Sequence, residues 1–244
     1  MLVLMVLITL FSGCNCSSLS AKPDKAFEKQ VLEVIEQNPE FIAGIMIKYS
    51  KDKQEAEEEK SFQESLDQRQ TIKLGESPSL GNKDAKYQLI VFVDLQCPYC
   101  RQAETTIDQL QEKYGKNIFL VYKNSPLAFH KEAKPAAKAA LAASLQGKFF
   151  EYKDQLYKNQ LLLGEIMYLE IARDLKLDIK KFNQDRAGDQ IQELLEQDVK
   201  QAKQLDIAGT PCFFFNGVRV PGAYPLKYFE KVLKSIGSKT TSRS

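Results

Sequence analysis

VFVDLQCPYCRQAETTIDQL, residues 91–110, changes halfway from an apolar run to an amphipathic pattern. The apolar run begins at Tyr87 and is typical of a strand buried on both faces of a sheet. Apolar positions beyond the cysteines recur at helical spacing: Ala103, Ile107, Leu110 and Tyr114. Gly115 then predicts the end of the helix. The pattern therefore predicts a strand and a helix that meet at Cys97 and Cys100.

The segments on either side extend this pattern. NIFLVYKN, residues 117–124, predicts a second strand after the helix, and GESPSLGNKDA, residues 75–85, predicts a loop before the first strand. The order strand, helix, strand favours an α/β fold with the cysteine pair at a strand-to-helix junction.

This placement suits thiol chemistry. The N–H groups and positive dipole end of a helix stabilise a thiolate, and Cys97 lies where that effect is greatest. Cys100 is one turn further along the same face and can form a disulfide with Cys97. Pro98 fits the first helical turn, and Tyr99 is expected to modulate access and packing. The pattern favours electron exchange by this pair.

Two other uses of the cysteine pair are weaker. A tetrahedral zinc site needs four ligands, but no second closely spaced pair follows, and His130 is the sole histidine of the sequence. An inert structural disulfide is also disfavoured, because five cysteines in 244 residues are too few for a disulfide scaffold. No metal is predicted.

A second feature lies at residues 207–223, IAGTPCFFFNGVRVPGA. Thr210 and Pro211 lead into a predicted strand over residues 212–215, and a turn at Asn216–Gly217 starts a hairpin with residues 218–220. A proline that leads directly into a buried strand suggests a cis peptide bond. Spacing alone does not place this loop beside Cys97.

Composition and the N-terminus narrow the class of protein. A net charge of +2 and 43% hydrophobic residues describe a globular chain without a field that would attract nucleic acid. Residues 1–14, MLVLMVLITLFSGC, resemble a lipoprotein-type signal peptide that ends at a lipid-bearing Cys14. A plain cleaved signal is the alternative interpretation. Residues 15–23 form a linker, in which Cys16 has no evident role.

Residues 24–70 predict two helices separated at Asn38–Pro39. The second helix opens with EFIAGIMIKY, which is apolar on more than one face and continues into a strongly charged stretch. Apolar residues of this kind need a partner, either the main domain or another copy of the chain, and we favour self-association. The charged stretch is interpreted as a solvated stalk.

The linked motifs resemble a known family. The C-P-x-C pair after a strand, the GTP loop before FFFNG and the closing helix resemble the thioredoxin superfamily, and more closely the DsbA-like thiol-disulfide oxidoreductases of the bacterial envelope. The resemblance covers residues 74–236, with a helical insertion at about 131–205 and a flexible tail at 237–244. EQNPEFI, in the N-terminal helices, is similar to ScsC-type proteins. Together, these two resemblances imply a thioredoxin fold with an inserted helical subdomain and an N-terminal helical extension.

The resemblance also implies roles for individual residues. Cys97 would be the nucleophile and Cys100 the resolving cysteine. The loop before the last strands would carry a cis-proline that faces the cysteine pair, so Thr210 and Pro211 would bind substrate main chain, with Pro98 and Tyr99 beside them. The sequence offers roles for three further residues: Asp94, His130 and Cys212. Asp94 either assists proton transfer at Cys100 or, as favoured, caps a loop. His130 either lies near the active site as an accessory residue or, as favoured, is a helix-start or packing residue. Cys212 either has a redox role or, as favoured, is a buried free thiol.

The sequence therefore predicts a thiol-disulfide oxidoreductase that forms or isomerises disulfides and needs no cofactor beyond the redox-active pair Cys97–Cys100. Its expected partners are cysteine-containing envelope proteins, a membrane redox partner, the membrane through a lipid on Cys14, and a second copy through residues 24–70. We expect it to face the periplasm, on the outer membrane rather than the inner. The alternative is a surface lipoprotein that uses the fold as a non-catalytic binding or chaperone module.

Overall fold

The computed structural model describes residues 24–241, with side chains as far as Gly237. The chain forms two compact units that divide between Ala56 and Glu57. The predicted signal peptide and linker, with Cys14 and Cys16, lie outside the described residues.

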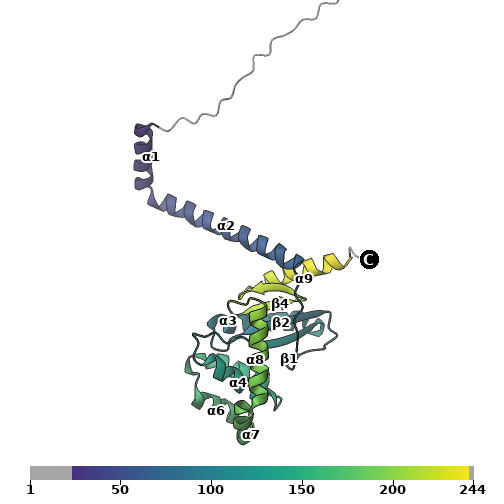
Figure 1. The fold of residues 1–244 in the computed structure, drawn as a ribbon. Coiled ribbons are helices and arrows are strands. Elements are labelled where there is room, and N and C mark those ends of the chain that lie inside the picture. The colour runs from purple at the N-terminus through teal and green to yellow at the C-terminus, as the bar shows by residue number, and fades with distance from the viewer. Residues whose placement is uncertain (1–23, 242–244) are drawn as a thin grey trace, which may run out of the picture. The chain divides into compact units, whose positions relative to one another are not determined.

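The larger unit contains a five-stranded sheet in the order β1-β3-β2-β4-β5 (Figure 1). The central strands β2 and β3 are parallel, whereas β1, β4 and β5 pair antiparallel with their neighbours. The elements in chain order are β1 (Ser79–Leu80), β2 (Tyr87–Val93), α3 (Pro98–Tyr114), η1 (Gly115–Asn117), β3 (Ile118–Asn124), α4 (Ala133–Ser144), α5 (Phe149–Lys158), η2 (Gln160–Leu162), α6 (Glu165–Asp174), α7 (Ile179–Ala187), α8 (Asp189–Gln204), β4 (Cys212–Phe215), β5 (Val218–Pro221) and α9 (Leu226–Thr241).

The central strands are apolar at successive positions, so both faces of the sheet are apolar and both are covered by other elements. Leu89 and Val91 of β2 belong to the core cluster that includes residues of α3, α5 and α9. Ile90 and Phe92 point to the opposite face and join a second cluster with Ala202 of α8. The alternation follows from the two-residue period of a strand. The near-continuous apolar run was therefore a sound signal for a central strand.

The helical insertion between β3 and β4 is built on the alanine-rich helix α4. Small side chains let neighbouring helices approach closely, and α4 contacts α5, α6, α7 and α8. A buried ion pair fastens the insertion to the sheet, because Lys123 Nζ of β3 lies 2.8 Å from Asp198 Oδ1 of α8. The insertion is thus held against the sheet by both apolar packing and a buried charge pair.

Two sequence predictions need correction. The predicted loop at residues 75–85 contains the short strand β1, which pairs with β3. The predicted helical region 24–70 is not one unit, because Phe62 and Leu66 are buried in the core of the larger unit. Phe62 also packs edge-on against Tyr228 at a centroid distance of 5.7 Å. The stretch interpreted as a solvated stalk is therefore anchored near its end by two apolar residues.

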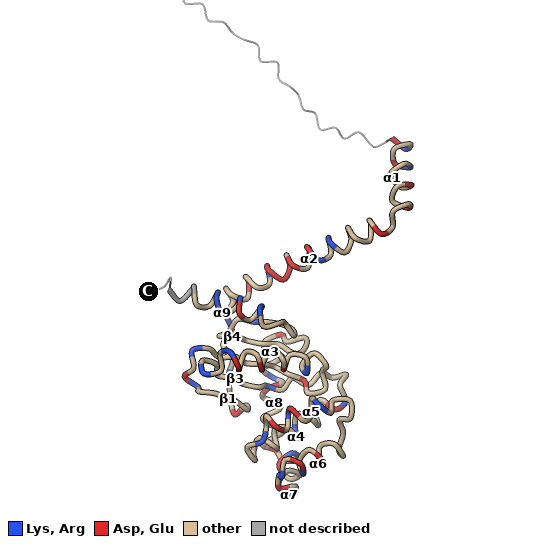
Figure 2. Tube along the Cα trace, turned by 180° about the vertical axis from the view of Figure 1, so that it is seen from behind, with Lys and Arg blue, Asp and Glu red and all other residues tan. Residues whose placement is uncertain are grey.

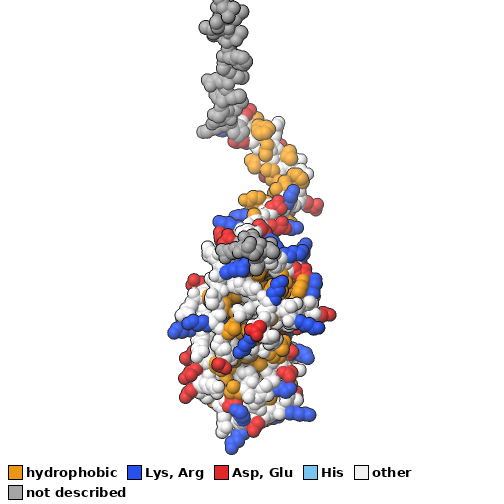
Figure 3. All heavy atoms as spheres, turned by 90° about the vertical axis from the view of Figure 1, so that its right-hand side faces the viewer, with side chains coloured by type: hydrophobic (Ala, Val, Ile, Leu, Met, Phe, Trp, Pro, Cys, Tyr) orange, Lys and Arg blue, Asp and Glu red, His pale blue; other side chains and the backbone are white. Residues whose placement is uncertain are grey.

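The smaller unit consists of α1 (Lys25–Gln37) and the first part of α2 (Pro39–Asp67), which meet at the predicted break. The carboxylate of Asp24 caps α1 by accepting a hydrogen bond from the Ala26 N–H. Beyond the apolar start of α2, acidic and basic residues follow one another (Figure 2). Hydrophobic side chains gather on α1 and the start of α2 in Figure 3. Within the described part of the chain, no helix combines the length and apolar character needed to span a membrane.

Candidate active site

The two cysteines lie where the sequence predicted, between β2 and α3. Cys97 is the N-cap residue of α3, with φ −75° and ψ 122°, and Pro98 occupies the first turn. The N–H of Cys97 donates to the Asp94 carbonyl, which closes a tight turn between strand and helix. Both cysteines are buried free thiols, and only 4% of Cys97 is exposed. Of the two cysteines, Cys97 is therefore the one with any exposed surface, because Cys100 is 0% exposed.

The surroundings of Cys97 favour its thiolate. Hydrogen bonding by the Cys100 thiol is the largest cause that lowers the pKa of Cys97, to about 5, and burial opposes it. The backbone N–H groups of Cys100 and Tyr99 and the side chain of Thr210 lower the pKa further. Donors at a helix N-terminus stabilise an anion in this way. Cys97 is thus the more readily ionised thiol of the pair.

Cys100 has the opposite character. Burial holds the pKa of Cys100 well above its usual range, and the neighbouring Cys97 raises it further. Its sulfur accepts a hydrogen bond from the Asp94 N–H at 3.4 Å. Cys100 stays protonated when Cys97 is ionised, so it can serve as the proton donor to the Cys97 thiolate and as the second, resolving thiol.

The structure brings the distant 207–223 segment to this site. Cys97 Sγ lies 3.3 Å from the Thr210 carbonyl oxygen, to which it donates a hydrogen bond when it is protonated. The Thr210–Pro211 peptide bond is cis, as the sequence predicted. Pairing of β4 with β2 accounts for the proximity, because Cys212 is opposite Phe92 in that ladder. Sequence spacing could not show this contact, which depends on the antiparallel pairing of two strands more than 100 residues apart.

Asp94 caps the loops around the site, which agrees with the favoured interpretation. Its carboxylate accepts hydrogen bonds from the N–H groups of Gln96 at 2.7 Å and Leu127 at 2.8 Å. His130 Nδ1 lies 2.8 Å from Asp94 Oδ2. His130 precedes α4 by three residues. Through Asp94 it also contacts residues 94–97, the active-site loop. These three contacts show that the Asp94 carboxylate holds the loops around the site together.

Cys212 lies on the other side of the sheet from the active cysteines. It packs with Phe214, Ile90 and Phe92, whereas Cys97 and Cys100 belong to the opposite core cluster. Burial raises the pKa of Cys212 to about 11. Cys212 is a buried free thiol. Although it follows Pro211 directly in sequence, it packs on the face of the sheet opposite the active cysteines.

The remaining predicted site residue, Tyr99, is 64% exposed beside Cys97. Two residues that sequence reasoning missed are Gln96 and Gln160, whose side chains bind backbone atoms across the active-site loop. No local pattern marks either glutamine. Within the described ranges, no group of three or more His, Cys, Asp or Glu side chains could hold a metal ion.

A profile of a thioredoxin family matches residues 73–235, about two thirds of the sequence. The chain belongs to the thioredoxin family. The match spans β1 to β5, most of α9 and the whole helical insertion, so Cys97, Cys100 and Pro211 all lie within the family region.

Solved structures place this thioredoxin-family chain among DsbA-like and ScsC-like folds. A thioredoxin-like oxidoreductase from Silicibacter pomeroyi is 28% identical, with a TM-score of 0.59 over 66% of this chain and 92% of that one. Wolbachia pipientis alpha-DsbA1 is 22% identical, with a TM-score of 0.61 over 70% of this chain and 96% of that one. The catalytic domain of Proteus mirabilis ScsC is 21% identical, with a TM-score of 0.58 over 72% of this chain and 96% of that one. The predicted thioredoxin fold with a helical insertion is confirmed.

Curated relatives of this thioredoxin-family chain include much longer proteins. The Na(+)/H(+) antiporter NhaA 3 of Salinispora tropica is 34% identical over 156 residues, which are 64% of this chain and 24% of the antiporter. The NhaA 1 of Salinispora arenicola is 34% identical over 164 residues, 67% of this chain and 25% of that protein. The chain therefore spans about a quarter of the length of the curated relatives it matches.

Proposed function

We propose that this protein is a thiol-disulfide oxidoreductase that exchanges disulfides with cysteine-containing proteins of the cell envelope. One observation carries the proposal: a sulfur with a pKa of about 5 lies at a helix N-terminus, beside a buried thiol whose pKa is raised. This asymmetry assigns attack or leaving-group chemistry to Cys97 and resolution to Cys100.

In the oxidising direction, the Cys97–Cys100 disulfide reacts with a substrate thiolate. The substrate sulfur bonds to Cys97 Sγ, the Cys97–Cys100 bond breaks, and Cys100 takes up a proton. A second substrate thiolate then attacks the substrate sulfur of the mixed disulfide. This step forms the substrate disulfide and releases Cys97 as a thiolate, so two electrons pass from substrate to protein. The Thr210 carbonyl lies against Cys97 Sγ, and Thr210 and Pro211 are proposed to bind the substrate main chain, with Pro98 and Tyr99 beside them.

The stabilised Cys97 thiolate supports donation of a disulfide, because it makes the reduced protein the favoured product. It also supports isomerisation, in which Cys97 attacks a wrong disulfide and is released without net electron transfer. We therefore propose an oxidase or isomerase, recharged where necessary by a membrane redox partner. Equilibration with glutathione tests the direction, and a strongly reducing potential in a monomeric protein would contradict both activities.

A trapping experiment tests the exchange reaction itself. In a Cys100→Ser variant expressed in its native envelope, a mixed disulfide between Cys97 and the substrate has no internal thiol to resolve it. We expect covalent complexes that reducing agent releases and that disappear in the Cys97→Ser, Cys100→Ser double variant. If no complex forms, the protein is instead the non-catalytic binding or chaperone module.

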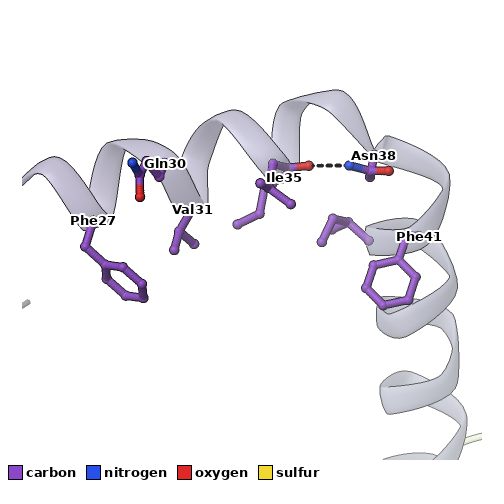
Figure 4. A pocket seen from close by; sticks show the side chains of 8 residues that line it. Phe27, Gln30, Val31, Ile35, Asn38 and Phe41 are labelled. Carbon is purple, nitrogen blue, oxygen red and sulfur yellow. Dashed lines mark hydrogen bonds between the residues drawn. The ribbon is translucent and has the colours of Figure 1, made fainter.

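We further propose that the smaller unit mediates association with a second copy of this chain. In Figure 4, Phe27, Val31, Ile35 and Phe41 point into the angle between α1 and α2. Phe27 is 59% exposed and Phe41 is 69% exposed, so the stripe continues across the helix break without a cover. A self-complementary apolar surface of this kind suits a symmetric interface. A Val31→Asp, Phe41→Asp variant should lower the mass measured in solution, and unchanged mass would refute the proposal.

Attachment to the membrane through a lipid on Cys14 is also proposed, with the protein facing the periplasm. Support comes from the apolar run and the small residues Ser12 and Gly13 that precede this cysteine. Asn15 stands where aspartate commonly marks inner-membrane retention, which favours the outer membrane. Labelled fatty acid should follow the protein and be lost in Cys14→Ala. We propose no ion transport, because the match leaves about three quarters of each antiporter uncovered.

A further inference from the structure

The short helix η2, in the helical insertion, exposes two leucine side chains and buries a glutamine side chain. Leu161 is 94% exposed and Leu162 is 66% exposed, whereas the adjacent polar residue Gln160 is only 7% exposed. Leucine is normally buried in preference to glutamine, so hydrophobic packing does not explain this orientation. The contacts of the glutamine side chain supply the explanation.

Gln160 faces the turn that carries Cys97. Its Nε2 donates to the Leu95 carbonyl at 3.1 Å and to the Cys97 carbonyl at 2.9 Å. A primary amide has two N–H donors, and both are used here. The Cys97 carbonyl also accepts the N–H groups of Cys100 and Arg101, which are the first hydrogen bonds of α3. One planar group therefore fixes two carbonyls on either side of the turn, at the start of the active-site helix.

The rest of the turn is held by the same insertion. We call residues 94–97 the active-site loop. The Asp94 carboxylate accepts the Leu127 N–H, and Gln96 Oε1 accepts the Glu132 N–H at 2.8 Å. Gln160 completes this set by binding the backbone of Leu95 and Cys97. All four loop residues thus have a hydrogen bond to the segment between β3 and α6.

We propose that Gln160 is a positioning residue that holds the Cys97 backbone at the N-cap of α3, where the positive dipole end of the helix favours a thiolate. The inference deepens the proposed exchange function, because it assigns part of the reactivity of Cys97 to an element 63 residues away. Cys97 adopts the N-cap conformation of α3, where the backbone N–H groups of Tyr99 and Cys100 help to lower the pKa of its thiol. Release of the two carbonyls lets the loop relax and weakens those contacts.

The test is a titration of the reduced full chain with Gln160→Met, which has nearly the same length and volume but no donors. The thiolate absorbance near 240 nm, or the rate of alkylation against pH, gives the ionisation of Cys97. We expect the titration midpoint to rise by about one pH unit, which lowers the thiolate fraction at pH 5 several-fold. The glutathione equilibrium should shift by up to about tenfold toward the disulfide form.

Leu161→Ala is the matched control, because it changes the same short helix at a side chain that is almost fully exposed. Its titration should coincide with that of the unaltered chain. Should Gln160→Met fail to fold by circular dichroism, Gln160→Asn carries the same test, since the shorter amide reaches only one carbonyl. A folded Gln160 variant with an unchanged midpoint would overturn the inference. The titration uses no substrate, so absence of mixed disulfides in the trapping experiment would refute the exchange function alone.

Discussion

At the scale of single residues, the two active cysteines differ because of what surrounds them. Cys97 has backbone and thiol donors around its sulfur, whereas Cys100 has mainly burial and one backbone N–H. An exposed cysteine titrates at about 8.5. The fold therefore moves the pKa values of two residues of the same kind in opposite directions within one helical turn.

A pH dependence of stability follows for the reduced protein. Between about pH 5 and 8.5, Cys97 is ionised in the folded chain and protonated in the unfolded chain, while Cys100 is protonated in both. The folded form binds fewer protons, so this contribution to the free energy of unfolding is complete above about pH 8.5 and is lost as the pH falls to about 5. Denaturant unfolding of the reduced chain should show this loss, and Cys97→Ser should lack it. If the free energy of unfolding changed with pH by the same amount in both proteins, the assignment of Cys97 as a thiolate would be contradicted.

At the scale of elements, local pattern predicted the parts of the fold whose signals are local. The strand before Cys97, the helix after it and the hairpin at Asn216–Gly217 all have short-range periodicity or turn chemistry, and the structure contains each of them. β1 was missed because two residues carry no period. The contacts of Gln160 and Asp94 with distant backbone atoms could not be predicted from the sequence, because they depend on the path of the whole insertion. The sequence thus predicted where the cysteine pair lies, and the structure shows which distant groups hold the loop around it.

The buried ion pair between β3 and α8 leads to a prediction about the insertion. Lys123 and Asp198 each have a side chain that is 4% exposed, and the Asp198 carboxylate also accepts the N–H of Asn124. Removal of one charge leaves the other buried without compensation, which typically costs about 3–5 kcal/mol. Asp198→Asn should therefore lower the free energy of unfolding by about that amount in denaturant titration. Asp185→Asn removes the partner of Lys181 at a more exposed site and should cost less than about 1 kcal/mol. Equal losses would contradict this account.

At the scale of the whole molecule, the boundary between the two units lies inside a helix. α2 begins in the smaller unit and ends in the larger one, where Phe62 and Leu66 are buried. Lys231 reinforces this end through an ion pair with Glu59 and a position 4.2 Å above the ring of Phe62. The end of α2 is therefore part of the larger unit.

Truncation tests that boundary. A chain of residues 57–244 should retain the stability of the larger unit, because it keeps both buried side chains of α2. A chain of residues 71–244 should lose about 3–6 kcal/mol, the value expected for removing two large apolar side chains from a core. Denaturant unfolding of both chains provides the comparison, and Phe62→Ala in the longer chain should give part of the loss. The boundary at Ala56 and Glu57 is wrong if the two truncated chains are equally stable.

The burial of Cys212 allows its rate of chemical labelling to report how often the core opens. A maleimide reaches this thiol only after the residues that cover this face of the sheet, Ala202 of α8 among them, move away from Phe92 and Phe214, because Cys212 is 1% exposed. With the other cysteines replaced by serine, its labelling rate under native conditions measures how often the core opens. The sulfur that takes no part in the proposed exchange thus records the kinetics of the scaffold on which that exchange depends.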